Sequence, residues 1–257
     1  MKAGEIAALL EELSPVRYSC GWDNVGMHVG RFDREVKKII VSLDIDDKAV
    51  AKAVETGADM IVSHHPLLFN GIKQINDKDF IGKRVITMIE NGINGYCMHT
   101  NYDSVGGMAT ETATIMRLRN AVVLEEVLDG EGIGRVGDLE KKITVKELCE
   151  EVKNVFSLDK VVLYGNEDDV VSRAAICPGS GKSTIDLAIE KGATTIITGD
   201  ITYHCGTDAV SKGINVIDAG HYGIEHIFIE KVGNYLLEKT KDVEVIKMKI
   251  DNPQKYI

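Results

Sequence analysis

The segment AVETGADMIVS at residues 53–63 aligns without a gap on AIEKGATTIIT at residues 188–198. Each copy has the pattern of a helix end, a Gly-Ala turn and a buried apolar strand. A second repeat follows each copy, because Gly-Ile-Asn at residues 92–94 recurs at residues 213–215, in both cases before another predicted strand. Two repeats in the same order predict two similar α/β halves related by internal duplication.

Helices and strands alternate around the first copy, which indicates βαβ units and a parallel sheet. We therefore expect an α/β fold of two similar three-layer halves with largely parallel or mixed sheets. The first half is predicted to span residues 1–120, with residues 228–257 returning to it, and the second to span residues 121–227. Predicted strands include residues 36–43, 60–63, 95–98, 121–128, 135–139 and 160–164, and predicted helices include residues 46–56, 78–91 and 144–155.

The composition is that of a globular protein, with 44% hydrophobic and 27% charged residues. Lys and Arg number 30 against 40 Asp and Glu, so the net charge of −10 disfavours nucleic acid as a partner. No apolar run reaches the roughly 18 residues of a membrane span, and the first 13 residues read as an acidic amphipathic helix rather than an export signal. The five cysteines are scattered. We expect a reduced, cytoplasmic protein that does not enter a membrane.

Histidines and carboxylates gather directly after the predicted strands. In open parallel sheets, ligands bind outside the carboxyl ends of the strands. Five of the seven histidines fall in four such loops, namely His64 and His65, His99, His204, and His221. Because carboxylates are interleaved with them, this concentration predicts a metal site.

The spacing of these residues favours two metal ions over one. His221 and Glu225 are four residues apart at the start of a predicted helix, so they share one helical face. His64 and His65 are adjacent, and adjacent side chains of an extended segment point to opposite sides. With Asp103 and Glu225 as bridging carboxylates, these five residues would bind two divalent ions, as in two-metal hydrolytic sites. Imidazole with carboxylate suits Zn, Fe, Mn or Ni. Taken alone, Asp103 also reads as a helix N-cap.

Three further residues lie close to these predicted ligands in sequence. His99 and His204 are expected to transfer protons, although a rim position or a role in orienting a ligand fits them equally. Asp200, which follows the strand of the second repeat, has the same alternatives. His28 and His226 are expected to be structural.

Two glycine-rich loops have a structural and a functional interpretation. The sequence PGSGKS at residues 178–183 is not a Walker A motif, because Ile176 stands where that motif needs glycine. It is either a tight turn or an anion site formed by Gly179, Gly181 and Lys182. The loop GWDNVG at residues 21–26 carries the only tryptophan, and is either a packed turn or a wall of the active-site pocket.

The chain resembles, from end to end, the NIF-three-like dinuclear metal centre family, whose members are widely called GTP cyclohydrolase I type two homologues. The resemblance implies metal ligands at the same five positions. It also implies a toroidal homohexamer, a trimer of dimers, with sites that face an internal cavity. The motifs that carry it are WDNVG at 22–26, SHHP at 63–66, HTNYD at 99–103, GSG at 179–181, TGD at 198–200, and GHY at 220–222 followed by Glu225.

The sequence departs from the family pattern in small ways. Met27 stands where Leu is usual, and Lys182 where a small residue is usual. The roughly 45 residues between the halves leave no room for the extra domain that some relatives carry.

The favoured function is that of a metal-dependent hydrolase that activates water to open the guanine imidazole ring of GTP, with Lys182 and its glycine turn holding phosphate. The nucleotide substrate comes from the resemblance and not from the residues. Two alternatives stay open: a non-catalytic metal-binding or regulatory ring protein, and a two-metal phosphoesterase. A screen of substrates separates the three.

Overall fold

The computed structural model describes residues 1–255, and the chain divides into two compact units. Unit 1 comprises Met1–Tyr102 and Phe228–Asp251, and unit 2 comprises Asp103–Ile227 with residues 252–255. The first segment of unit 1 thus ends at Tyr102, inside helix α4 (Thr100–Ser104), whereas the sequence placed the end of the first half at residue 120. No helix within residues 1–255 has both the length and the apolar character needed to cross a membrane.

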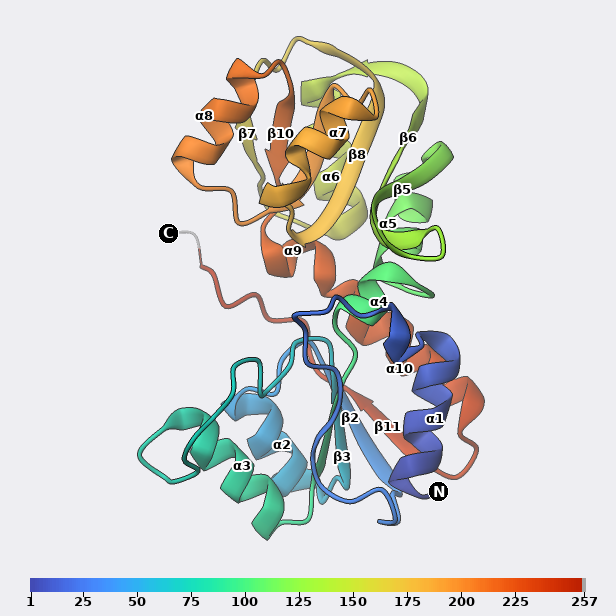
Figure 1. The fold of residues 1–257 in the computed structure, drawn as a ribbon, viewed down its shortest axis with the longest axis vertical. Helices are drawn as coiled ribbons and strands as arrows, with labels where there is room; N and C mark the ends of the chain where they lie inside the picture. The colour runs from blue at the N-terminus through green and yellow to red at the C-terminus, as the bar shows by residue number, and fades with distance from the viewer. Residues whose placement is uncertain (256–257) are drawn as a thin grey trace. The chain divides into compact units, whose positions relative to one another are not determined.

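Unit 1 is built on a five-stranded sheet in the order β1-β4-β3-β2-β11. Strand β1 is antiparallel to β4, and the other neighbours are parallel. Figure 1 shows α2 and α3 on one side of these strands and α1 and α10 on the other, which gives three layers. The strands are β1 (Gly26–Val29), β2 (Lys38–Ser42), β3 (Met60–Ser63), β4 (Asn94–Cys97) and β11 (Glu244–Lys247). The helices are α1 (Ala3–Leu13), η1 (Val16–Tyr18), α2 (Asp47–Thr56), α3 (Phe80–Glu90) and α10 (Ile227–Lys239).

Apolar side chains of the strands and helices form the core on both faces of this sheet. Ile40 and Ile61 are fully buried beneath Ala53 of α2 and Met88 of α3. On the other face, the hydroxyl of Tyr235 in α10 donates to a backbone carbonyl of α1. The parallel strands β2, β3 and β4 therefore end together, and the loops that follow them meet at one edge of the sheet.

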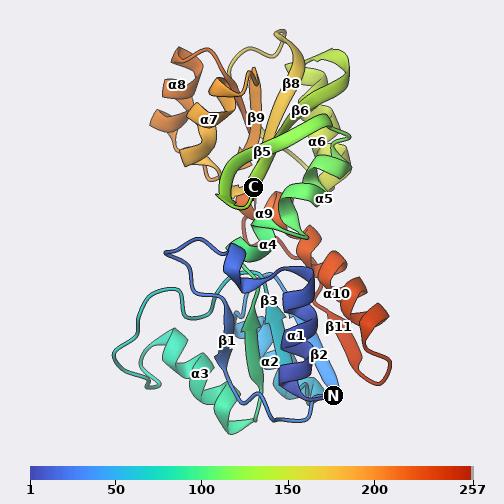
Figure 2. The same ribbon diagram turned by 45° about the vertical axis from the view of Figure 1, so that its right-hand side comes forward.

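Unit 2 is built on a six-stranded mixed sheet in the order β5-β6-β8-β9-β10-β7. Strands β8, β9 and β10 are parallel, and β5, β6 and β7 are attached in antiparallel fashion. Helices α7 and α8 lie on one side of these strands and α5 and α6 on the other (Figure 2). The strands are β5 (Arg119–Leu128), β6 (Glu131–Thr144), β7 (Val162–Tyr164), β8 (Val170–Ser180), β9 (Thr195–Gly199) and β10 (Asn215–Asp218). The helices are α5 (Met108–Ile115), α6 (Val145–Phe156), η2 (Lys182–Thr184), α7 (Ile185–Glu190), α8 (Tyr203–Ser211) and α9 (His221–Glu225).

The two sheets repeat one arrangement, β1-β4-β3-β2 in unit 1 and β7-β10-β9-β8 in unit 2. The Gly-Ala turns also match, because the amide of Ala58 donates to the carbonyl of Ala53 at 2.8 Å and that of Ala193 to Ala188 at 2.9 Å. These equivalences confirm the predicted α/β class with two similar halves.

An asparagine opens the equivalent strands β4 and β10. The side-chain oxygen of Asn94 accepts from the amide of Arg31 at 3.0 Å, and that of Asn215 accepts from the amide of Asn166 at 2.9 Å. In both units the residue before this amide is a glycine with positive φ, where a Cβ atom would collide with the asparagine. The repeat therefore includes an equivalent hydrogen bond from a backbone amide to an asparagine side chain, as well as the same backbone arrangement.

Candidate metal centre

Three imidazoles converge at the strand ends of unit 1. His64 and His65 follow β3, and His99 follows β4, the parallel neighbour of β3. Their nearest potential ligand atoms all lie within 4.8 Å of one another. His64 is fully buried, and the ring centroids of His65 and His99 lie 5.0 and 5.3 Å from its own.

Each of these rings is held through its Nδ1 atom by an oxygen acceptor. His64 Nδ1 is 2.8 Å from the carbonyl oxygen of Met98, and His65 Nδ1 is 2.8 Å from Oδ1 of Asp44. His99 Nδ1 is 2.8 Å from Oδ1 of Asp23. Because carbonyl and carboxylate oxygens only accept, Nδ1 carries the hydrogen and Nε2 is the nitrogen that offers a lone pair to a metal ion.

The ionised carboxylate of Asp23 orients the ring of His99. The Asp23 side chain is fully buried and also accepts hydrogen bonds from the amide of Thr100 at 3.0 Å and from the Thr100 hydroxyl at 2.5 Å. Burial acts to raise the pKa of Asp23, but the hydrogen bonds and the charge of His99 outweigh it and lower this pKa to about 2. At neutral pH a negative charge therefore faces the His99 ring.

The ligand pair of unit 2 lies in α9, which follows β10. His221 Nε2 and Glu225 Oε2 are 3.0 Å apart, and His221 Nδ1 is 2.7 Å from Oδ2 of Asp200. Two ligands at about 2.0–2.2 Å from one ion are about 2.8–3.1 Å apart in octahedral geometry and about 3.3–3.6 Å apart in tetrahedral geometry. The pair fits a divalent ion, and Asp200 orients the imidazole in the way Asp44 orients that of His65.

Two glycines keep space open around this pair. A Cβ atom at position 179, where φ is +69°, would lie 2.4 Å from Oε1 of Glu225 and 3.5 Å from Nε2 of His221. A Cβ atom at position 199 would lie 2.5 Å from the amide nitrogen of His221. Glycine at both positions is therefore required by the close approach of α9 to the ends of β8 and β9.

Asp103, the remaining predicted ligand, lies in α4 within unit 2. Burial raises the pKa of the Cys177 thiol to about 12, and the charges of Asp103, Glu125 and Glu225 act in the same direction. Asp103 and Glu225 offer carboxylate oxygens that lie within 4.8 Å of each other. Two carboxylates and one oriented imidazole in unit 2 are a donor set for the metals predicted from the sequence.

The residues predicted for anion binding and for a second proton transfer have other surroundings. The amide of Gly181 donates to the hydroxyl of Thr198 at 2.8 Å, and Lys182 is exposed at the start of η2. His204 is exposed on α8, with its ring 5.4 Å from that of Tyr203, and belongs to none of the converging ligand groups among residues 1–255. The roles of Gly179, Gly181, Lys182 and His204 stay predictions.

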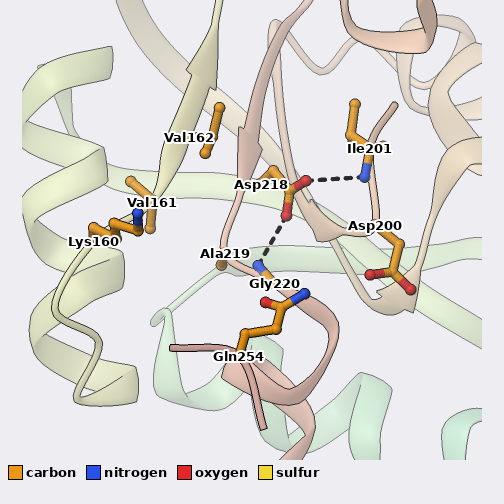
Figure 3. A pocket seen from close by; sticks show the side chains of 9 residues that line it. All are labelled: Lys160, Val161, Val162, Asp200, Ile201, Asp218, Ala219, Gly220 and Gln254. Atoms are coloured by element: carbon orange, nitrogen blue, oxygen red, sulfur yellow. Dashed lines mark hydrogen bonds between the residues drawn. The ribbon is translucent and has the colours of Figure 1, made fainter. Parts of the chain in front are cut away.

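A cavity of about 220 Å³ opens in unit 2 beside Asp200. Figure 3 shows Lys160 on the far side of this cavity from Asp200, with Gln254 below them. The carboxylate of Asp218 accepts from the amides of Ile201 and Gly220, both at 2.9 Å, and so shapes the cavity wall. Lys160, Asp218 and Gln254 were not predicted from the sequence as residues of a candidate site.

The two units define a class of α/β proteins in which imidazoles held by oxygen acceptors lie at the carboxyl ends of parallel strands, in groups that could bind a metal ion. Comparison with known proteins makes the assignment specific. The chain belongs to the family described as Duf34/NIF3 (NGG1p interacting factor 3), whose pattern matches residues 1–253.

Similar proteins support this membership over the whole chain. A Clostridium perfringens protein called GTP cyclohydrolase 1 type 2 homolog is 36% identical over 253 residues, 97% of each chain. A protein of the same name from Methanocaldococcus jannaschii is 32% identical over 252 residues, 96% of this chain and 99% of the relative. Among solved structures, reduced HcgD from Methanocaldococcus jannaschii superposes with a TM-score of 0.85 at 31% identity, covering 96% of this chain and 97% of its own. Staphylococcus aureus protein SA1388 gives 0.90 at 26% identity, covering 100% and 99%.

Proposed function

We propose that the protein is a metal-dependent hydrolase in which His64, His65, Asp103, His221 and Glu225 bind two divalent ions. The observation that carries the proposal is the shared orientation of the imidazoles, since every predicted histidine ligand has its Nδ1 atom on an oxygen acceptor. This orientation fixes the tautomer that a ligating Nε2 needs. Zn, Fe, Mn and Ni all suit the donor set.

The chemistry follows from the ions and from the residues that surround them. When bound, two such ions lower the pKa of a water molecule to near neutrality and so supply a hydroxide nucleophile. Asp44 and Asp200 keep His65 and His221 in their ligating orientation. His99, held by Asp23, presents Nε2 as a proton acceptor, and the ionised Asp23 stabilises the ring once it carries a second proton.

The name of the relatives supports GTP as the substrate. Hydrolysis of the guanine imidazole ring consumes two water molecules: the first opens the ring between C8 and N9, and the second releases C8 as formate. The cavity beside Asp200, with Lys160 and Gln254 in its wall, supports binding of a small polar molecule. The homohexamer implied by the family resemblance remains a proposal that a native-mass measurement tests.

Formate release from GTP by protein loaded with Zn, Fe, Mn or Ni tests this function. We expect the His65→Ala variant to be inactive. The His99→Ala variant is expected to lose about 10²- to 10⁴-fold in kcat, the usual contribution of a general base. His204→Ala tests the other predicted proton carrier, and a loss confined to His99→Ala assigns the transfer to His99.

The same screen separates the alternatives. Turnover of a simple phosphoester such as p-nitrophenyl phosphate, without formate from GTP, would make the protein a phosphoesterase. If wild type and His65→Ala are equally inactive on every substrate, the hydrolase proposal is wrong and a non-catalytic metal-binding protein remains.

A further inference from the structure

An aromatic cluster on unit 1 adjoins the three imidazoles. Trp22 and Phe69 are 63% and 49% exposed, with ring centroids 5.9 Å apart. The ring of His99 lies 6.1 Å from that of Trp22 and 6.2 Å from that of Phe69. All three contacts are edge-to-face, so the rings form a triangle with two exposed corners and one corner in the imidazole group. We call Trp22, Phe69 and His99 the aromatic triangle.

A network of hydrogen bonds joins the loops that carry the two exposed rings. The Asn24 side chain donates to the carbonyl of Leu68 at 2.6 Å. The amide of Leu68 donates to Nδ1 of His28 at 3.2 Å, so Nε2 of His28 carries the hydrogen and donates to the carbonyl of Asn24 at 3.0 Å. Burial lowers the pKa of His28, which favours this neutral form. These hydrogen bonds fix the loop that carries Trp22 relative to the loop that carries Phe69.

A second anchor sets Trp22 relative to His99. Asp23, the next residue along the chain, binds both the His99 ring and the first residue of α4, Thr100. The amide of Cys20, on the other side of Trp22, donates to the Thr100 hydroxyl at 2.9 Å. Fixing large apolar rings in an exposed position leaves apolar surface in water, but it lowers the entropic cost of binding a ligand there.

We propose that the aromatic triangle stacks the planar heterocyclic base of a nucleoside or nucleotide, with Trp22 and Phe69 as residues that contact the base. This inference rests on the proposed function and names the part of the substrate that unit 1 recognises. A nucleobase presents a π face that stacks on aromatic side chains, whereas a sugar phosphate presents none. His99 belongs to both the triangle and the imidazole group, so a base stacked there lies beside the proposed metal ligands.

The single tryptophan makes the proposal directly measurable. We would titrate metal-free wild-type protein with guanosine monophosphate and follow the fluorescence of Trp22, with ribose 5-phosphate as the ligand that lacks only the base. We expect saturable quenching by the nucleotide and none by ribose 5-phosphate. Phe69→Leu should weaken nucleotide binding about 5- to 150-fold, the range that base–aromatic stacking spans.

A matched control comes from another exposed phenylalanine of unit 1. Phe80 is 61% exposed and does not belong to the aromatic triangle. Its ring partner is the guanidinium of Arg84, 4.9 Å from the ring centroid of Phe80. Phe80→Leu should bind the nucleotide as wild type does. Calorimetry on Trp22→Leu, which lacks the fluorophore, should show the same loss as Phe69→Leu, and thermal unfolding should show that all three variants fold.

The inference is overturned if the nucleotide does not quench Trp22, or if folded Phe69→Leu and Trp22→Leu keep wild-type affinity. It is also overturned if ribose 5-phosphate binds equally well, since phosphate alone would then account for binding. These measurements use no metal and no turnover. A failed hydrolase assay therefore leaves them standing, and their failure leaves the proposed metal site untouched.

Discussion

Replacing Gly179 by alanine tests whether Glu225 and His221 need the space in front of them. At φ +69° a residue with a Cβ atom costs about 1–2 kcal/mol of stability. The added Cβ atom would also lie 2.4 Å from Oε1 of Glu225, about 1 Å short of ordinary contact, so the carboxylate must move. Mutating a residue that only orients a metal ligand already lowers metal affinity 10- to 100-fold, so we expect the zinc affinity of Gly179→Ala to fall by at least about that factor.

Gly130→Ala separates the backbone effect from the effect on the site. Gly130 has a similar φ of +77°, and a Cβ atom there would meet nothing within 4 Å. Both variants should unfold at a temperature a few degrees below wild type, but only Gly179→Ala should lose zinc in competition with a chelator. Equal zinc affinity of the two variants would refute the placement of Glu225 in the metal site.

Three further predictions follow from single contacts. Asp200→Asn should weaken zinc binding about 10- to 100-fold, because Nδ1 of His221 loses its acceptor. Asp186→Asn breaks only an exposed ion pair with Lys212 and should leave zinc affinity unchanged. Competition with a chelator measures the zinc affinity of both variants. Burial raises the pKa of Cys177 from an ordinary thiol value of 9.0 to about 12. The protonated thiol therefore contributes fully to stability below pH 9, and this contribution is lost as the pH rises toward 12. In urea unfolding, the stability of Cys177→Ala should decline less than that of wild type between these two pH values. Asn94→Ala and Asn215→Ala should each lower the free energy of unfolding by about 1–3 kcal/mol in calorimetry, because partly buried backbone amides lose their partners. Asn70→Ala, at an exposed position without positive φ, should change it little.

Much of the fold was predictable because the repeat carries local signals. Residues 53–63 and 188–198 contain a helix end, a turn glycine and an apolar strand, and all three are set by neighbours in sequence. The order of strands was not predictable in this way. Strand β11 joins β2 across some 200 residues, and β6 runs from Glu131 to Thr144, much longer than the segment 135–139 predicted from its apolar residues. Pairing with β5 and β8 extends it through polar residues.

The local sequence pattern singled out the candidate metal ligands, whose metal binding stays a prediction. It also singled out Asp200, which holds His221, but not the carboxylates that hold His65 and His99. His64 and His65 directly follow an apolar strand and His221 comes three residues after one, which is a local pattern. The partner of His99 is Asp23, 76 residues away, and only the fold brings them together. Asp44 follows β2 as the histidines follow their strands, so the same rule could have found it.

The division of the chain shows the same limit. The sequence predicted that the first half extends to residue 120. In the structure the boundary falls at Tyr102 and Asp103, and α5 packs on β6 and β8 of unit 2. Sequence order therefore predicted the elements but not the unit to which each one belongs.

The most direct test of the metal centre is elemental analysis of protein that has been saturated with zinc and then dialysed. We expect two ions per chain for wild type and fewer for His65→Ala and Glu225→Gln. One ion or none per wild-type chain would contradict the paired site, as would two ions that both variants retain.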